Sequence, residues 1–320
     1  MRRKALVRLL DSVHVQTEYP NQIIIVDGSI DTRTETILKK NIYKNLNYFK
    51  VDDANRGLTK QRNFGIKQVD KSSEIICFLD DDVVLETDYF EELLATYKVY
   101  PKALAVGGYI INEVKWKPTD NKDDNSRFYY DDWMRKEPSR FKIRRYFGLA
   151  PNAAPGFLPT FGHGRSVSFL PPSGKTYHVE QIMGGVSSYK KEVFSILKFS
   201  THFEGYGLYE DADFSLRLAK LGDLYVNTMA RLVHFHDGSG RPNQYKYGKM
   251  VVRNGWYVWR VKYPRPSFSA KIKFHATSFL LTLIRASNIL TSKEKKKALT
   301  ETLGRISGWF SLIFNKPKLH

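Results

Sequence analysis

The chain has 320 residues, of which 42% are hydrophobic and 26% are charged, a composition that excludes a disordered protein and allows one large core or a core with an appendage. A single cysteine, Cys77, excludes an intrachain disulfide framework and fits a reducing compartment, and we expect it to pack as a small apolar side chain. The net charge of +18 lies mostly in residues 241–320, where 17 Lys or Arg oppose Glu294 and Glu301, a net of +15.

The N-terminal sequence predicts no signal peptide, because basic residues 2–4 are followed by a helical pattern instead of a continuous apolar run. The longest uncharged apolar segment near the C-terminus, residues 274–284, is far shorter than the ~20 residues of a spanning helix. We therefore expect a cytoplasmic protein that is soluble or peripheral on the cytosolic face of a membrane.

The first elements alternate between helix and strand. Residues 4–16 have apolar side chains at helical spacing. Residues 23–26 form an apolar run without polar alternation, as in a parallel strand covered on both faces. This strand ends at Asp27-Gly28-Ser29, and Asp31 is placed to cap a helix that starts near residue 32.

The alternation continues with a short strand at 48–51, a helix through residues 62–66, a strand at 75–79, a helix at 88–100 and a strand at 105–111. This order predicts an α/β fold with a mostly parallel sheet flanked by helices, and ligands bind at the carboxyl ends of such strands.

Residues 113–178 lack periodicity and are rich in Pro, Gly and aromatic residues, which is typical of a functional or mobile segment. A helix at 211–221 and a strand at 230–236 follow. We expect a first domain at 1–240, with 113–178 as an irregular insert, and a basic amphipathic helical region at 241–320, including a helix at 271–290.

Three consecutive aspartates, Asp80-Asp81-Asp82, follow the apolar strand 75–79. Adjacent carboxylates repel one another, and a bound cation offsets that repulsion. The alternative is a solvated turn that caps a helix, because Asp is common in both places.

Several motifs occur in a fixed order: Asp27-Gly28-Ser29, the Asn55-x-Gly57 and Arg62-Asn63 segment, the aspartate triplet, Gly184-Gly185, and Glu210-Asp211 with Arg217-Leu218. Together they resemble the family 2 glycosyltransferases, over roughly residues 5–240. The resemblance implies the GT-A fold, which is Rossmann-like, with the basic helical region as a C-terminal extension.

The resemblance also implies residue roles. Asp27 matches the aspartate that contacts the nucleobase of the sugar donor, and Arg62 lies where a helix approaches the nucleotide. Asp80, Asp81 and Asp82 match the DXD motif, whose carboxylates contact the ribose and hold a divalent metal. Asp211 matches the catalytic base.

The chemistry of sugar transfer agrees with these roles. Mg²⁺ or Mn²⁺ on carboxylate oxygens stabilises the charge that develops on a departing diphosphate, with Asp82 as the main ligand and Asp80 beside it. A carboxylate can take the proton of the acceptor hydroxyl; Asp211 fits this role, and Glu210 is the reserve candidate. Both can instead be first-turn acids favoured by the helix dipole.

Further candidates come from two other segments. His234 and His236 point to one face of their strand, and the resemblance implies that a histidine here can complete the metal site, with His234 better placed. Packing or solvent contact is the alternative for both. In the insert, Tyr129 and Trp133 are candidates for stacking on the acceptor, or they pack a lid.

One feature departs from the family, whose members begin with a buried strand in the middle of the sheet. This chain begins at the helix that should follow it. A missing central strand leaves its neighbours' N–H and C=O groups unpaired, at about 1–3 kcal/mol each. We expect either that a preceding segment is missing, which would put activity in question, or that the neighbouring strands move together.

The function implied is inverting, metal-dependent transfer of a sugar from a UDP- or dTDP-linked donor to a hydroxyl of a saccharide or lipid-linked acceptor, in cell-surface polysaccharide synthesis. The alternative is a non-catalytic GT-A-like protein that binds nucleotide or a membrane surface. The basic C-terminal region suits an anionic membrane, or docking on the catalytic domain. No nucleic-acid motif accompanies the charge, so no nucleic-acid partner is expected.

Overall fold

The computed structural model describes residues 2–203, 206–236 and 243–319 and divides into two compact units. The first unit joins Met1–Lys115 with Leu170–Ser239, and the second joins Trp116–Phe169 with Gly240–His320. Every sequence motif described above lies in the first unit. The second unit begins again at residue 240, near the predicted boundary, but it also contains residues 116–169. The division into domains at 1–240 and 241–320 therefore stays a prediction.

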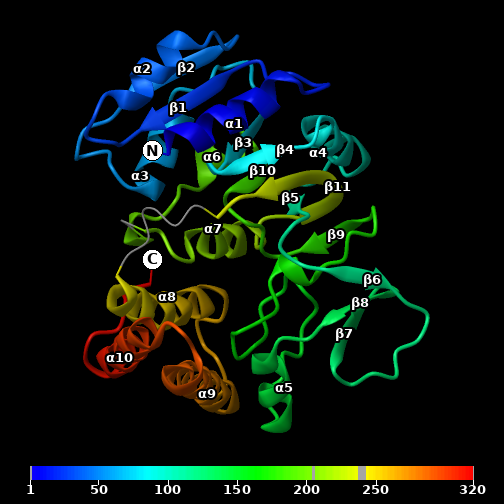
Figure 1. Ribbon diagram of the computed structural model, residues 1–320, viewed down its shortest axis with the longest axis vertical. Helices are drawn as coiled ribbons and strands as arrows, with labels where there is room; N and C mark the ends of the chain where they lie inside the picture. Colours follow the sequence, from blue (N-terminus) through cyan, green and yellow to red (C-terminus); the bar gives the residue numbers. More distant parts are fainter. Residues whose placement is uncertain (1, 204–205, 237–242, 320) are drawn as a thin grey trace. The chain divides into compact units, whose positions relative to one another are not determined.

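A two-stranded parallel sheet occupies the N-terminal part of the first unit (Figure 1). Its strands and helices are α1 (Arg3–His14), β1 (Ile23–Asp27), α2 (Arg33–Lys40), β2 (Leu46–Lys50) and α3 (Leu58–Ile66). Leu6 and Leu10 of α1 pack with Ile25 of β1 and Leu38 of α2 in one buried cluster. The amphipathic pattern that predicted α1 therefore describes the face that covers this sheet.

A second, larger sheet carries the rest of the first unit, in the order β3-β10-β5-β11-β4 with β9 paired to β11. Its strands are β3 (Ile75–Leu79), β4 (Val83–Leu85), β5 (Ala105–Ile110), β9 (Thr176–Val179), β10 (Val186–Lys190) and β11 (Leu224–His234). The helices of this part are α4 (Tyr89–Val99), α6 (Val193–Ile196) and α7 (Glu210–Leu218), with a short 3-10 turn η2 (Thr201–Phe203). The 3-10 turn η1 (Val167–Phe169) belongs to the second unit.

The predicted α/β fold is confirmed, but less of its pairing is parallel than the element order suggested. β1 pairs with β2 and β5 with β11 in parallel. β10 is antiparallel to β3 and β5, and β11 is antiparallel to β4 and β9. The βαβ rule predicts direction only where a crossover helix joins consecutive strands, and β10 is reached through the long segment after β5 instead.

β1 and β3 belong to different sheets in the described part of the chain, so these strands have not moved together into one ladder. Cys77 lies on β3, which stands at the end of the larger sheet and, among the described residues, pairs with β10 alone. Its side chain is exposed, so the prediction that it packs inside is wrong. An apolar run indicates a buried strand on average and does not show which residue faces an uncovered side.

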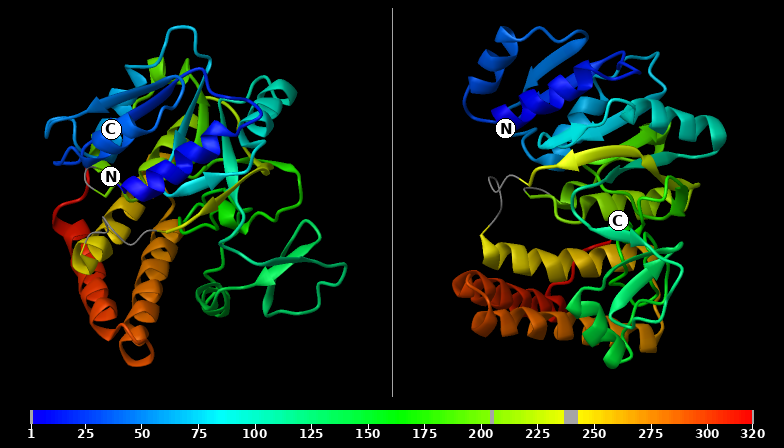
Figure 2. Two further views of the ribbon diagram at one scale, coloured as in Figure 1. Left: turned by 45° about the horizontal axis from the view of Figure 1, so that its top comes forward. Right: turned by 45° about the vertical axis from the view of Figure 1, so that its right-hand side comes forward.

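The second unit contains a three-stranded antiparallel sheet and the C-terminal helices (Figures 1 and 2). Its elements are β6 (Trp116–Pro118), β7 (Arg127–Tyr130), β8 (Trp133–Lys136), α5 (Ser139–Tyr146), α8 (Gln244–Lys262), α9 (Phe268–Thr291) and α10 (Lys295–Phe314). The predicted helix at 271–290 lies inside α9. Among the described residues, no helix combines the length and the apolar character that a membrane span requires.

Close packing of α8 on α10 depends on glycines. A Cβ atom on Gly248 would lie less than 3.0 Å from the backbone oxygen of Glu301, and one on Gly304 would meet the backbone of Tyr245 equally closely. Real Cβ atoms essentially never approach so closely. At these two positions the helix backbones are therefore in direct contact, with only the glycine hydrogen atoms between them.

Candidate functional site

The aspartate triplet connects β3 to β4. The backbone N–H of Asp80 donates to the carbonyl of Gly185 at 2.9 Å, and the N–H of Phe235 donates to the carbonyl of Asp82 at 3.0 Å. The turn is thus tied to the start of β10 and to the end of β11. Asp82 is buried, with 3% of its surface exposed, which is unusual for an isolated carboxylate.

Asp80, Asp82 and His234 form a group that could hold a metal ion, because one ligand atom from each lies within 4.8 Å of the others. Nε2 of His234 lies 3.3 Å from Oδ1 of Asp82. Carboxylate oxygens with one imidazole suit a divalent ion such as Mn²⁺. Desolvation raises the pKa of Asp80, and the negative charges of Asp82 and Asp81 raise it further, whereas Arg62 lowers it. A bound cation would reduce the repulsion between these carboxylates.

In this structure the guanidinium of Arg2 contacts two of the three aspartates. Its Nε donates to Oδ1 of Asp81 at 2.9 Å, and NH1 donates to Oδ2 of Asp82 at 2.5 Å. The backbone N–H of Arg2 also donates to Asp81, at 3.1 Å. A positive group therefore lies where the carboxylates face, and it neutralises charge as a metal would.

Gly184 and Gly185 bring the aspartate turn close to α7. A Cβ atom on Gly185 would lie less than 3.0 Å from the carboxylate of Asp80, and one on Gly184 would collide with the side chains of Glu210 and Arg62. The N–H of Gly184 donates to Oδ2 of Asp211 at 3.3 Å. Asp211 is thus held beside the aspartate turn by a segment that tolerates no side chain.

Glu210 and Arg62 form a buried ion pair, with NH1 of Arg62 2.5 Å from Oε1 of Glu210. NH2 of the same guanidinium lies 4.0 Å from Oδ1 of Asp80, and the group lies over the rings of Phe78 and Phe199. Desolvation raises the pKa of Glu210, and Arg62 opposes the shift. Arg62 therefore links the aspartate turn to α7, and Glu210 is already engaged by a cation.

Asp27, expected at the nucleobase, is fully buried at the end of β1. Its Oδ1 accepts hydrogen bonds from the N–H and the hydroxyl of Ser29, at 2.8 and 2.5 Å, and its Oδ2 accepts one from the Tyr48 hydroxyl at 2.9 Å. Desolvation raises its pKa, but these hydrogen bonds outweigh it and leave the pKa below its ordinary value. The carboxylate is held rigid, and its nucleobase role remains a prediction.

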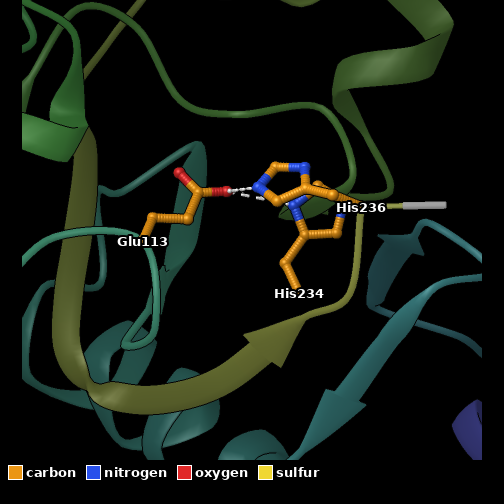
Figure 3. A group of neighbouring side chains, drawn as sticks. All are labelled: Glu113, His234 and His236. Atoms are coloured by element: carbon orange, nitrogen blue, oxygen red, sulfur yellow. Dashed lines mark hydrogen bonds and ion pairs between the residues drawn. The ribbon is translucent and has the colours of Figure 1, made fainter. Parts of the chain in front are cut away.

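Glu113, which stands in none of the sequence motifs, lies beside both histidines (Figure 3). Its Oε1 is 3.1 Å from Nδ1 of His234 and 3.0 Å from Nε2 of His236. The hydrogen bond with His234 lowers the pKa of Glu113 and raises that of His234. Glu113 follows β5 and His234 ends β11, and the carboxyl ends of these paired parallel strands meet at one edge of the sheet; the pairing itself is seen only in the structure.

The expected acceptor residues, Tyr129 and Trp133, lie on β7 and β8 of the second unit. Tyr130 and Trp133 face each other across the hairpin, and the hydroxyl of Tyr129 accepts a hydrogen bond from the N–H of Asp124 at 3.0 Å. Both residues therefore belong to a small aromatic sheet. Contact with an acceptor remains a prediction.

The family model described as glycosyl transferase family 2 matches residues 1–159. This segment holds β1, the aspartate turn and Glu113, around which the candidate site is built. This match confirms the resemblance to the family 2 glycosyltransferases over residues 1–159.

Curated relatives and solved structures are similar to this chain, and two of the relatives are described first. Glycosyltransferase GlyA of Streptococcus pneumoniae serotype 4 is 33% identical over 105 residues, which cover 32% of this chain and 15% of GlyA. The glucosyl-dolichyl phosphate glucuronosyltransferase of Haloferax volcanii is 26% identical over 148 residues, 46% of this chain and 40% of that protein. The chain thus spans less than half the length of either relative.

The crystal structure of the mannosyltransferase PcManGT from Pyrobaculum calidifontis, in complex with GDP-Man and Mn²⁺, superposes with a TM-score of 0.54 at 12% identity. The match covers 99% of this chain and 85% of that one. It confirms the GT-A type of α/β fold.

Proposed function

We propose that this protein is an inverting, metal-dependent glycosyltransferase that moves a sugar from a nucleotide-diphosphate donor to a hydroxyl group. One observation carries the proposal: Gly185 lies against the carboxylate of Asp80, and the adjacent Gly184 donates its N–H to Asp211, so one two-residue segment contacts both the group of Asp80, Asp82 and His234 and the Asp211 carboxylate. Ligands for a metal on a diphosphate and a carboxylate for proton transfer are what this reaction requires together.

Asp80, Asp82 and His234 would hold Mg²⁺ or Mn²⁺. When bound, the ion neutralises negative charge on the diphosphate that leaves. The mannosyltransferase with the similar fold was solved with GDP-Man and Mn²⁺, which supports this class of donor. We keep UDP and dTDP as the expected nucleotides, with Asp27, Arg62 and Asp81 on the donor side.

Asp211 would act as the general base. As the acceptor oxygen bonds to the anomeric carbon, its proton passes to the Asp211 carboxylate and the bond from that carbon to the diphosphate oxygen breaks, which inverts the configuration. Glu210 is less suitable, because its Oε1 is paired with Arg62 at 2.5 Å in a buried environment. A carboxylate positioned for proton transfer contributes about 10²–10⁴-fold to the rate.

We further propose that the acceptor is a saccharide or a lipid-linked saccharide of cell-surface polysaccharide synthesis, presented at an anionic membrane surface. Exposed apolar side chains follow one face of α9 and one face of α10. On α9 these are Phe268, Ile272, Phe279, Leu283 and Leu290, and on α10 they are Leu299, Leu303, Ile306, Phe310, Ile313 and Phe314. α9 and α10 together carry seven Lys or Arg and one Glu, a net of +6 of the +15 charge of residues 241–320. Apolar faces with basic surroundings suit the interface of an anionic bilayer.

Calorimetry with UDP, and in parallel with GDP, tests the donor site. Wild-type protein is expected to bind nucleotide in the presence of Mn²⁺ and only weakly with EDTA. Asp82→Asn, which keeps the size of the side chain and removes a charged ligand, should remove the metal dependence. Absence of metal-dependent binding in the wild type would instead support a non-catalytic protein that retains the fold.

A further inference from the structure

We propose that Glu113 is a positioning residue that fixes the ring of His234, so that Nε2 of this histidine faces the metal held with Asp80 and Asp82. The inference rests on the proposed metal site and adds a residue to it. Glu113 would not touch the ion or the donor. It acts through the histidine.

The backbone of His234 is held from two sides. Its N–H donates to Oδ1 of Asn112 at 3.0 Å, and its carbonyl accepts from Nδ2 of Asn112 at 2.8 Å. On the other side, His234 is the partner of Val83 in the antiparallel pair of β11 with β4. These contacts fix the position of the Cα atom, but they leave the imidazole free to rotate about its side-chain bonds.

Glu113 removes that rotational freedom. Its Oε1 lies 3.1 Å from Nδ1 of His234, while Nε2 on the opposite side of the ring lies 3.3 Å from Oδ1 of Asp82. A neutral imidazole has one N–H donor and one nitrogen acceptor. A carboxylate that accepts the Nδ1 proton therefore leaves the Nε2 lone pair directed at Asp82, and metal-binding histidines are commonly oriented in this way.

His236 holds Glu113 in turn. Its Nε2 lies 3.0 Å from the same Oε1, and the two imidazole rings are 4.0 Å apart between centroids (Figure 3). About half of the His236 side chain is exposed, whereas 19% of that of His234 is. His236 is absent from the group formed by Asp80, Asp82 and His234; with Glu113 and His234 it forms a second group whose ligand atoms lie within 4.8 Å of one another, but that group contains neither of the two aspartates. We assign it to the orientation of Glu113 instead of to the ion.

The test measures Mn²⁺ binding by electron paramagnetic resonance, with pulsed detection of nitrogen coupled to the bound ion. Glu113→Ala should weaken Mn²⁺ binding about 10–100-fold and reduce the nitrogen signal, because the ring loses its fixed orientation. Glu113→Gln should retain part of both, since an amide oxygen can still accept the Nδ1 proton. Thermal denaturation of each variant checks that it is folded.

Asp223→Asn is the matched control. Asp223 is the carboxylate partner of another histidine in the same unit, His178, at 3.5 Å, and it lies just before β11, at the end opposite His234. This variant should bind Mn²⁺ with wild-type affinity and an unchanged nitrogen signal. Both properties depend on the metal group and on Glu113, which lie at the opposite end of β11 from Asp223.

Three results would overturn the inference. A folded Glu113→Ala variant with wild-type Mn²⁺ affinity and full nitrogen signal would show that His234 needs no support from Glu113. A stoichiometry of two ions, reduced to one by Glu113→Ala, would make Glu113 a ligand itself. Absence of Mn²⁺ binding in the wild type would remove the metal site and the proposed function together, which distinguishes that failure from the first two.

Discussion

Glu210 and Asp211 are adjacent in sequence, yet their side chains have different surroundings. Glu210 is buried and paired with Arg62, whereas Asp211 is less buried and accepts a hydrogen bond from the N–H of Gly184. Neighbouring positions at the start of a helix point in different directions, so this difference follows from the geometry of α7. Replacing each carboxylate with its neutral amide should therefore have different effects on activity and stability.

We predict that Asp211→Asn lowers the rate of sugar transfer by about 10²–10⁴-fold while stability and Mn²⁺ affinity change little. Glu210→Gln should instead lower the free energy of unfolding by about 3–5 kcal/mol, because it leaves the buried guanidinium of Arg62 without its close carboxylate. Urea denaturation and initial rates, measured on both variants, separate the two effects. A stable, fully active Asp211→Asn variant would contradict the assignment of the base.

The contact of Arg2 with Asp81 and Asp82 gives a second prediction. The guanidinium must leave these carboxylates before a metal can use them, so Arg2→Gln should raise the affinity for Mn²⁺. Titration of residues 1–320 with Mn²⁺ measures the change. Arg33→Gln is the control, since Arg33 pairs with Asp31 elsewhere in the same unit and should have no effect. Equal affinities in wild type and Arg2→Gln would show that Arg2 does not compete.

The sequence identified those site residues that stand in recognisable motifs. The aspartate triplet and Glu210-Asp211 are examples, because each follows or opens an element that periodicity predicts. Glu113 could not be singled out, because an isolated glutamate after a strand is common. Its contact with His234 depends on which strand lies beside β5. Strand order comes from tertiary packing, and one sequence does not reveal it.

Elements far apart in the sequence meet at the aspartate turn. β3, β10 and β11 each contribute backbone or side-chain contacts there, and α7 approaches through Gly184 and Gly185. The existence of most of these elements was predictable from apolar periodicity. The directions of the strands were harder to predict, because β10 and β4 run antiparallel to their neighbours and are not joined to them by a crossover helix.

The crossing of α8 on α10 gives a prediction about stability. Gly304→Ala places a methyl group less than 3.0 Å from the backbone of Tyr245, and the helices must separate to accept it. We expect a loss of about 1–3 kcal/mol, although alanine favours helix more than glycine does. Thermal denaturation measures it, with the partly exposed Ser307→Ala on the same helix as control. An unchanged or higher melting temperature would contradict such close packing.

Charge and exposed apolar surface together describe the molecule as a whole. The net charge of +18 is concentrated in residues 241–320. With ~3.6 residues per turn, the exposed apolar positions of α9 fall within an arc of about 60°, and those of α10 within about 100°. Such narrow stripes are typical of helices that rest on another apolar surface.

We predict that the protein sediments with vesicles containing anionic lipid and much less with vesicles of phosphatidylcholine alone, and that salt weakens the binding. Replacement of Phe279, Leu283 and Phe310 by Ser should reduce sedimentation. The control is Ile42→Ser in the first unit, where the side chain is 97% exposed but stands outside the stripes. Equal loss in both variants, or binding that ignores lipid charge, would contradict a membrane role for α9 and α10.

The most direct test of the central claim needs no acceptor. Nucleotide sugars linked to UDP, dTDP and GDP are incubated with the protein, and release of the nucleoside diphosphate is measured with Mn²⁺ or with EDTA. We expect slow hydrolysis of at least one donor, which requires Mn²⁺ and is abolished in Asp82→Asn. Hydrolysis that persists in EDTA or in Asp82→Asn, or no release from any donor by protein that is folded, would contradict a metal-dependent donor site at the aspartate turn.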